Sequence, residues 1–394
     1  MTKWEKVTLA ECCHSITDGD HQSMPVSEYG VPFIIISNIK NNRIDFEDTR
    51  FVPSEYYDSL DVTRKAQRGD ILYTVKGSFG IPAYVDSDMP FVFQRDIAIL
   101  KCNNKVNSKF LYYIMKSVEF ERLADLLAIG SAQRAITLKT LRGIEIMIPE
   151  KSEQDRIVNL LSPYDDLIEN NQKQIKLLEE AAQRLYKEWF VDLRFPGYEA
   201  VQIIDGVPEG WSEKSMDEIA DYLNGYAFKP SDWGERGKPI IKIKELNEGV
   251  TKDTPRNSGD SIPKKYTIYS GDIVFSWSAT LTAKIWDAEE GLLNQHLFKV
   301  TPNKGICREY VLQSILKTLD EFSYLTTGST MKHIQRGKLK QVFVKVPTQD
   351  IMNKFEVLAN TYREQILTLK HQLILIQEAR DRLLPKLMSG EIEL

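Results

Sequence analysis

The sequence GSAQRAITLKTLRGIEIMIP, residues 130–149, has a close counterpart in GSTMKHIQRGKLKQVFVKVP, residues 328–347. Both stretches open on Gly-Ser, continue through a segment rich in Lys and Arg, and end in alternating apolar residues before a proline. Alternation of this kind is typical of a half-buried β-strand. The second stretch begins 198 residues after the first, and we therefore predict that the chain contains two copies of one structural unit.

The repeat continues on both sides of these stretches. Downstream, the same offset aligns a long series of apolar residues, from Ile157 with Phe355 to Leu185 with Leu383. Upstream the match is looser, and PFI at 32–34 and RGDIL at 68–72 resemble PII at 239–241 and SGDIV at 270–274. The similarity occurs twice only, which indicates a duplication and not a solenoid.

Each copy is predicted to consist of a strand-rich region followed by one long helix. Short β-branched and aromatic runs punctuated by Gly, Pro, Asn and Asp indicate the strands, and we expect one shorter helix in each copy, at Ser108–Leu127 and Arg308–Leu325. Residues 152–190 and 350–388 carry apolar residues at steps of three and four, a narrow seam typical of coiled coils. Ser152 is the expected N-cap of the first long helix.

A long helix with one apolar seam must bury that seam, and the other copy offers an equally long partner. We expect an antiparallel intramolecular coiled coil; the alternative is an amphipathic helix packed on its own domain. The predicted fold class is α+β, with two similar strand-rich α/β domains that alternate with two long helices about a pseudo-two-fold. The predicted domains are residues 1–150, a helix and linker at 151–204, residues 205–348, and a helix at 349–394.

Bulk properties are those of a cytoplasmic globular protein. The chain has 394 residues and a net charge of −5, which gives no global indication of a polyanion partner. Its apolar runs are too short to cross a membrane, and the first residues lack the apolar core of a signal peptide. The four cysteines, Cys12, Cys13, Cys102 and Cys307, have no metal or disulfide spacing, and we expect reduced packing residues.

Sequence signatures of catalysis are absent. The chain contains no GxxxxGK[ST] phosphate loop, no HExxH zinc helix and no GxSxG nucleophile motif, and its five histidines are scattered. Asp70 and Asp272 follow Gly at equivalent positions, where we expect them to stabilise turns through hydrogen bonds to the backbone. We therefore expect a protein that binds and positions a partner, with no catalytic or metal site of its own.

Two pairs of loops are candidates for binding nucleic acid. The basic loops combine phosphate-binding cations with polar side chains that can read base edges; the alternative is an ordinary solvated surface. Their candidate residues are Ser131, Gln133, Arg134 and Lys139 in the first copy and Thr330, Lys332, His333 and Arg336 in the second. The loops after the Gly-Asp strands differ between the copies, and their candidates are Lys76, Ser78, Phe79, Trp277, Ser278 and Thr280.

This organisation resembles the specificity subunits of type I restriction–modification enzymes over essentially the full length. The resemblance lies in the duplicated order of motifs: the Gly-Asp strand, the Gly-Ser and basic loop before a strand and Pro, and the long helix ending Glu-Ala-x-x-Arg-Leu. The first long helix begins Glu153-Gln154-Asp155, whereas the second begins Thr348-Gln349-Asp350 and lacks the Glu-Gln pair.

The resemblance implies a non-catalytic subunit whose two target recognition domains, 1–150 and about 205–348, each read one half of a split double-stranded DNA target in the major groove. The helices would set the gap between the half-sites. It further implies two methyltransferase subunits that use S-adenosylmethionine to methylate adenine N6, and motor-nuclease subunits that use ATP and Mg²⁺. Two alternatives stay open: a coiled-coil scaffold whose heads bind protein or glycan, and a self-contained nuclease or methyltransferase.

Overall fold

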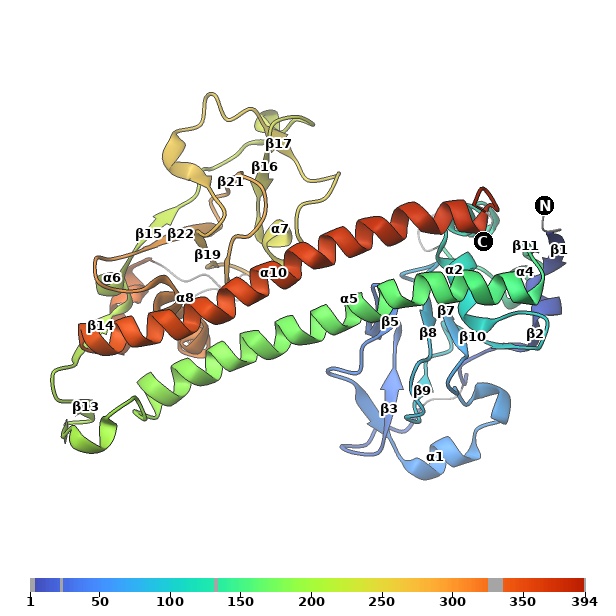
Figure 1. Ribbon diagram of the computed structural model, residues 1–394, viewed down its shortest axis with the longest axis horizontal. Helices are drawn as coiled ribbons and strands as arrows, with labels where there is room; N and C mark the ends of the chain where they lie inside the picture. The colour runs from blue at the N-terminus through green and yellow to red at the C-terminus, as the bar shows by residue number, and fades with distance from the viewer. Residues whose placement is uncertain (1–3, 22–23, 131–133, 325–335, 393–394) are drawn as a thin grey trace. The chain divides into compact units, whose positions relative to one another are not determined.

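The computed structural model describes residues 4–21, 24–130, 134–324 and 336–392. The chain divides into two compact units (Figure 1). The first unit comprises Met1–Asn170 and Leu373–Leu394, and the second comprises Asn171–Gln372. Each unit thus contains one strand-rich head and one end of each long helix, and each is described separately below.

The head of the first unit is built on two small sheets. The larger has the order β2-β10-β7-β8, and the second has the order β6-β3-β9. A separate pair joins the start of the head to its end, since β1 runs antiparallel to β11. The strands are β1 (Glu5–Thr8), β2 (Cys13–Asp18), β3 (Val31–Ile34), β6 (Arg50–Val52), β7 (Ile71–Thr74), β8 (Pro82–Tyr84), β9 (Val92–Phe93), β10 (Ile97–Cys102) and β11 (Glu145–Ile148).

The head of the second unit repeats this topology. The counterpart of the larger sheet has the order β15-β22-β19-β20, the counterpart of the smaller sheet has the order β17-β16-β21-β18 with one strand more than in the first head, and β14 pairs with β23. In both heads one strand pair is parallel, β3 with β9 and β16 with β21. The strands are β14 (Ser212–Ser215), β15 (Ala220–Asn224), β16 (Lys238–Ile241), β17 (Arg256–Asn257), β18 (Thr267–Ile268), β19 (Ile273–Ser276), β20 (Thr282–Ile285), β21 (Gly291–Leu293), β22 (Leu297–Pro302) and β23 (Phe343–Val346). The predicted duplication is confirmed.

Small hairpins and short helices complete the heads. The hairpins are β4 (Ile39–Lys40) with β5 (Arg43–Ile44), and β12 (Ile203–Ile204) with β13 (Val207–Pro208). The short helices are α1 (Ser54–Ser59), α2 (Ser108–Lys116), α3 (Val118–Leu127), α4 (Leu138–Arg142), α6 (Met216–Ile219), α7 (Ile243–Glu248), α8 (Arg308–Lys317) and α9 (Leu319–Tyr324).

The single helices predicted at 108–127 and 308–325 are each two helices. At the first break, Ser117 leaves the helical conformation with ψ 150°, and its hydroxyl accepts a hydrogen bond from the Phe120 N–H. A serine in this extended conformation is a favourable N-cap. The residue therefore ends α2 and starts α3, although the apolar periodicity continues across it.

The Gly-Asp turns have the role that the sequence predicts. The Asp70 carboxylate accepts the Gln67 N–H at 2.8 Å, and the Asp272 carboxylate accepts the Tyr269 N–H at 2.8 Å. A lysine from the central strand of the same sheet pairs with each aspartate, Lys101 at 2.6 Å and Lys299 at 2.7 Å. The same turn thus precedes the equivalent strands β7 and β19.

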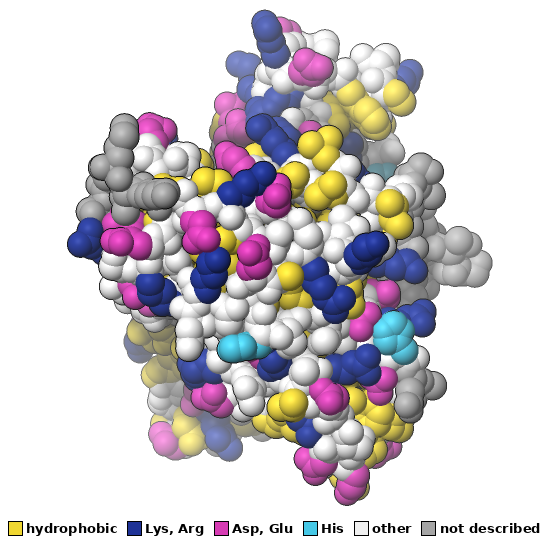
Figure 2. All heavy atoms as spheres, turned by 90° about the vertical axis from the view of Figure 1, so that its right-hand side faces the viewer, with side chains coloured by type: hydrophobic (Ala, Val, Ile, Leu, Met, Phe, Trp, Pro, Cys, Tyr) yellow, Lys and Arg dark blue, Asp and Glu magenta, His cyan; other side chains and the backbone are white. Residues whose placement is uncertain are grey.

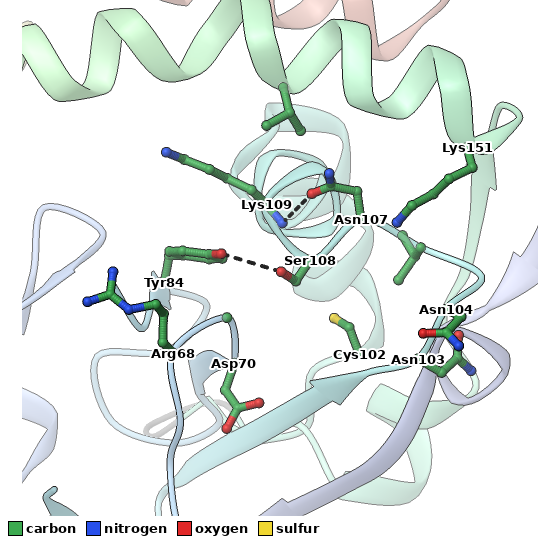
Figure 3. Close-up of a pocket in the computed structure, with 13 residues that line it drawn as sticks. Arg68, Asp70, Tyr84, Cys102, Asn103, Asn104, Asn107, Ser108, Lys109 and Lys151 are labelled. Carbon is green, nitrogen blue, oxygen red and sulfur yellow. Dashed lines mark hydrogen bonds between the residues drawn. The ribbon is translucent and has the colours of Figure 1, made fainter. Parts of the chain in front are cut away.

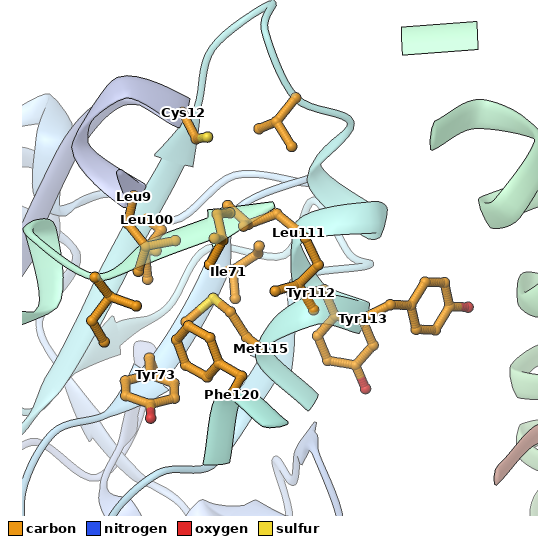
Figure 4. Close-up of a cluster of buried hydrophobic side chains, with 14 of the residues drawn as sticks. Leu9, Cys12, Ile71, Tyr73, Leu100, Leu111, Tyr112, Tyr113, Met115 and Phe120 are labelled. Carbon is orange, nitrogen blue, oxygen red and sulfur yellow. The ribbon is translucent and has the colours of Figure 1, made fainter. Parts of the chain in front are cut away.

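Each head packs its helices against its larger sheet. In the first unit, side chains of β7, β10 and α2 meet in one apolar cluster with Leu9 and Phe120, and Figure 4 shows these residues facing one another. Cys12 lies in the same cluster. All four cysteines are free; Cys102 is half-buried and the other three are buried, which confirms their prediction as packing residues.

The two long helices are α5 (Lys151–Tyr186), which continues into a π-helical turn at Lys187–Val191, and α10 (Gln349–Met388). In the first unit, Ile157 and Leu161 near the start of α5 join the same core as Leu384 and Leu387 near the end of α10. In the second unit, the ring of Phe190, in the π-helical turn that follows α5, lies 4.8 Å from that of Phe355 near the start of α10. Within each unit the helices are therefore antiparallel, as predicted.

The predicted N-cap of the first long helix is wrong. Lys151 precedes Ser152 inside α5, and the Ser152 hydroxyl donates to the Glu150 carboxylate at 2.8 Å and does not cap the helix. The nearby Gln154 anchors this end of the helix, because its side-chain oxygen accepts the Asn107 N–H at 2.8 Å and its amide donates to the Pro149 carbonyl at 2.9 Å. Met352, the equivalent residue of α10, is buried among apolar side chains, which accounts for the missing Glu-Gln pair.

Candidate nucleic-acid interface

In the first unit, the two loops proposed from the sequence lie side by side. The loop after β7 forms an antiparallel bridge from Lys76 to Ala135 in the basic loop. The Ile136 N–H also donates to the Val75 carbonyl at 2.9 Å. Two segments that are about 60 residues apart in the sequence thus form one surface at the end of β7 that lies away from the Gly-Asp turn.

The candidate residues of this surface have different environments. Lys76, Ser78 and Lys139 are exposed, the last on α4, whose N-cap is Thr137. Phe79 is partly buried, and its ring packs edge-on against Tyr73 at a centroid distance of 6.4 Å. Phe79 therefore supports the loop, whereas the other three present polar groups to solvent.

Arg134 is exposed, but its guanidinium is paired with another residue of the same head. Its guanidinium forms an ion pair with Asp125 of α3 at 2.8 Å and donates to the Asp125 carbonyl at 2.6 Å. An exposed ion pair of this kind contributes little to stability, so the guanidinium can exchange the aspartate for another anion at small cost. Ser131 and Gln133 lie outside the described residues.

In the second unit, Ser278 is buried with 2% exposure, and its hydroxyl lies 3.3 Å from Nδ1 of His296. Trp277 is partly buried, with its ring 6.0 Å from that of His296 and 5.8 Å from that of Phe298. Thr280 is exposed. This loop is therefore fixed from beneath by an aromatic and histidine cluster.

The second basic loop is described only in part. Thr330, Lys332 and His333 lie outside the described residues. Arg336 begins the short 3-10 helix Arg336–Gln341, and the Leu339 side chain of this helix is buried in the apolar core of the second head.

A tight turn that the sequence analysis did not select lies beside these loops in both heads. It comprises residues 94–96 (QRD) between β9 and β10, and residues 294–296 (NQH) between β21 and β22. The Val75 N–H donates to the Asp96 carbonyl at 2.9 Å, which joins the first turn to the loop that contains Lys76. The signal that could have identified the turns is a polar tripeptide that interrupts an apolar run at equivalent places in both copies.

A groove of about 760 Å³ lies at the other end of β7, beside the Gly-Asp turn, the start of α2 and the start of α5 (Figure 3). Its lining includes the cations Arg68, Lys109 and Lys151, and Tyr84 and Ser108 lie within hydrogen-bonding distance of each other at 3.4 Å. None of the candidate DNA-contacting residues lines the groove. It is therefore separate from the candidate interface.

Buried charges fasten the first head to the helix pair. Asp165 of α5 accepts the Tyr113 hydroxyl of α2 at 2.8 Å and the Arg380 guanidinium of α10 at 2.9 Å, and Lys116 of α2 lies 3.7 Å away. Burial raises the pKa of Asp165, but Lys116 and these two hydrogen bonds outweigh burial, and the net pKa is lowered. Burial also lowers the pKa of Lys116.

The second head is fastened by a pair of opposite orientation. Glu309 of α8 pairs with Arg363 of α10 at 3.4 Å. Burial raises the pKa of Glu309 in spite of this arginine. In the first unit the acid is on the long helix, whereas in the second unit the base is on the long helix.

One face of the molecule carries charges of both signs. The face drawn in Figure 2 shows Lys and Arg interspersed with Asp and Glu, without a large area of one sign. Within the described ranges no group of three or more His, Cys, Asp or Glu residues is placed to hold a metal ion. No helix in that part of the chain is long and apolar enough to span a membrane.

Comparison with known proteins gives this arrangement its context. The model of the family described as "Type I restriction modification DNA specificity domain" matches residues 1–180 and again residues 208–371. The chain belongs to this family. The first match covers the first head and most of α5, and the second covers the second head and the first part of α10. This division agrees with the duplicated topology.

Two similar proteins are named as specificity subunits of type I restriction enzymes. The MjaIX specificity subunit of Methanocaldococcus jannaschii is 27% identical over 82% of this chain and 78% of its own length. The HindI specificity subunit of Haemophilus influenzae is 22% identical, and the match covers both chains completely. The prediction of a type I specificity subunit is thereby confirmed.

A solved structure shares the fold. The type I restriction–modification S subunit from M. genitalium superposes with a TM-score of 0.58 at 18% identity, and the match covers 98% of this chain and 96% of that one. At this level of identity the likeness concerns the fold alone.

Proposed function

We propose that this specificity subunit recognises a bipartite duplex DNA target, with one half-site read by each head in the major groove. The observation that carries the proposal is that two heads of the same topology carry unlike residues at equivalent positions of the same end. A shared scaffold with unlike contact residues is suited to two different sequences in one kind of groove.

The cations of the first head support contact with DNA. Lys76, Lys139 and Arg134 are exposed on the surface formed by the two loops and α4. Lysine and arginine contacts to phosphates supply affinity that does not depend on sequence and that weakens with salt. The net charge of −5 does not oppose this, because local charge determines the contact.

The long helices are proposed to set the spacing of the half-sites. At about 1.5 Å per residue, the 36 residues of α5 extend over roughly 54 Å. Half-sites on one face of DNA are about 34 Å apart for each helical turn. A helix pair of this length is sufficient to hold two readers at such a separation.

Two methyltransferase subunits are the proposed partners on these helices. We propose the polar stretches 169–176 and 365–372 as the contact surfaces, together with one exposed apolar residue beyond each stretch. Leu177 and Leu375 occupy equivalent positions of α5 and α10 and are 63% and 52% exposed. Equivalent apolar positions fit two copies of the same partner.

In the proposed complex, this chain performs no chemistry. The methyltransferase subunits bind S-adenosylmethionine, flip the target adenine out of the duplex and methylate N6. Motor-nuclease subunits supply ATP- and Mg²⁺-dependent cleavage. The complex acts in the cytoplasm, where bacterial or archaeal DNA is accessible.

The test is to express the chain with its cognate methyltransferase subunit in cells free of other adenine methylation and to map N6-methyladenine in the genome. We expect one motif consisting of two short specific parts separated by a fixed unspecific gap. Deletion of the gene for this chain should abolish the methylation. A continuous motif, or methylation that persists without this chain, would exclude the proposal in favour of the scaffold or of another specificity factor.

A further inference from the structure

The tight turns at 94–96 and 294–296 have the same backbone hydrogen bonds in the two heads. In the first, the Ile97 N–H donates to the Gln94 carbonyl at 3.0 Å, and the Gln94 N–H donates to the Ile34 carbonyl of β3 at 2.9 Å. In the second, the Leu297 N–H donates to the Asn294 carbonyl and the Asn294 N–H to the Ile241 carbonyl of β16, each at 3.0 Å. Each turn is thus fixed to a strand of the smaller sheet.

A glycine lets a further segment pass directly over each turn. Gly19 donates its N–H to the Ile97 carbonyl at 3.3 Å, and Gly225 donates to the Leu297 carbonyl at 3.0 Å. A Cβ on either glycine would lie 2.2 Å from a carbonyl oxygen, that of Phe93 or that of Asn294. Such an approach is possible only for glycine, so the turns are held on both sides by backbone.

The side chains on these rigid turns differ between the heads. Arg95 is exposed, and it forms no hydrogen bond or ion pair with any residue that the structure describes. Its neighbour Gln94 is half-buried and donates to Asp96 at 2.9 Å. At the equivalent positions, Gln295 is exposed and its amide lies 3.4 Å from Nε2 of His296, while Asn294 is buried.

These residue types match the chemistry of base edges. The arginine fork donates to both acceptors of guanine in the major groove, whereas a glutamine amide pairs with the donor and acceptor of adenine. Backbone contacts fix the Cα positions from which Arg95 and Gln295 extend, and the first turn lies next to the cationic surface around Lys76. A rigid turn of this kind presents its side chain to a base edge from a constant position, and contact with the base then orders the side chain.

We infer that the two turns are base-reading elements, with Arg95 contacting a guanine in one half-site and Gln295 contacting an adenine in the other. This inference rests on the proposed bipartite recognition. It assigns specificity to positions outside the loops selected from sequence, which then supply mainly phosphate contacts.

The experiment compares the complete complex, with its cognate methyltransferase subunits, carrying Arg95→Gln, Arg95→Lys, Gln295→Arg or no substitution. Arg122→Gln, at an exposed arginine on α3, is the matched control. Methylation in cells and equilibrium binding to DNA duplexes with every single-base change in the target are measured in parallel. Binding reports on variants whose methylation is too weak to map.

Arg95→Gln and Arg95→Lys should each reduce the preference for one guanine of one half-site by roughly 5- to 150-fold, with the other half-site unchanged. Gln295→Arg should alter the preference only in the other half-site, and Arg122→Gln should alter neither. Uniformly weaker binding with wild-type base preferences, or no change at all, would refute the reading role. The proposed function itself would be refuted by a different result, namely that the unsubstituted complex recognises no split target.

Discussion

At the scale of single residues, Asp165 is the position at which three helices converge. It binds Tyr113 and Lys116 from the head and Arg380 from the other long helix. The residue equivalent to Arg380 in α5 is Ala182, and the residue equivalent to Asp165 in α10 is Arg363. Two α10 helices paired in the same register would therefore oppose Arg363 and Arg380, so these charges favour the pairing of α5 with α10.

Asp165→Asn should lower the free energy of unfolding by about 3 kcal/mol, because it removes the carboxylate that faces the buried Lys116 and leaves Arg380 paired with Asp381 alone. The side chains of Lys116 and Arg380 are only 13% and 12% exposed. The matched control is Asp166→Asn, at the adjacent carboxylate, which is 73% exposed and pairs with Lys109 at 3.9 Å. The control should change stability by less than about 0.5 kcal/mol. Urea unfolding of both variants measures the difference, and equal effects would show that the network is not structural.

The same network predicts a dependence on pH. The pKa of Asp165 is lowered in the folded state, so its ionisation stabilises the fold fully above the ordinary carboxyl pKa of about 4. The contribution is lost as the pH falls through the lowered value. The stability difference between the unsubstituted chain and Asp165→Asn should thus be largest near pH 7 and shrink below about pH 4. Urea titrations across this range provide the measurement, and a difference that grows on acidification would contradict the assignment.

At the scale of elements, periodicity predicted the long helices and the duplicated strands but not where the shorter helices break. The apolar seam of α5 is formed by many residues and is therefore visible as a periodic pattern. The break after α2 depends on the single hydroxyl of Ser117, which leaves no such pattern. Ser152 has the same hydroxyl, yet the helix begins before it. Which serine caps a helix is determined by backbone conformation and by neighbours distant in the sequence, such as Asn107 for the start of α5.

Only part of the candidate interface could be predicted from the sequence, for a similar reason. The sequence identified the loop at Lys76 and the basic loop that contains Arg134, and the structure shows that the first of these contacts the second. It could not indicate that Ser278 is buried beside His296, because a serine in a loop gives no sign of its tertiary neighbours. Clusters of cations indicated the basic loops, whereas Arg95 is a single cation within an apolar run and gives no such signal.

Substitution of the exposed leucines of the long helices tests the partner surface. Leu177→Asp and Leu375→Asp should each weaken assembly with the methyltransferase subunit by at least tenfold, because a carboxylate would be placed in an apolar contact. Leu126→Asp, at a leucine of α3 that is 83% exposed, is the control and should assemble normally. Analytical ultracentrifugation with the cognate subunit measures the affinity. Normal assembly of both helix variants would show that the partner binds elsewhere.

At the scale of the whole chain, the duplication places one head near one end of each long helix, and both helices pass from one unit to the other. α5 does so between Asn170 and Asn171, and α10 between Gln372 and Leu373. The two crossings are opposite each other in the helix pair, since the Asn171 amide lies 3.4 Å from the Gln372 side-chain oxygen. A change of length at both crossings thus leaves the packing within each unit unaltered.

Insertion of four residues at both crossings should therefore lengthen the gap in the DNA target. Four residues add about 6 Å and slightly more than one helical turn, so each unit keeps nearly the same orientation. At 3.4 Å per base pair, the preferred spacer should grow by one or two base pairs. An equal insertion after Gly206, in the exposed turn between β12 and β13, should leave the spacer unchanged. Methylome mapping of both variants measures the spacer, and an unaltered gap in the first variant would show that the helices do not set the spacing.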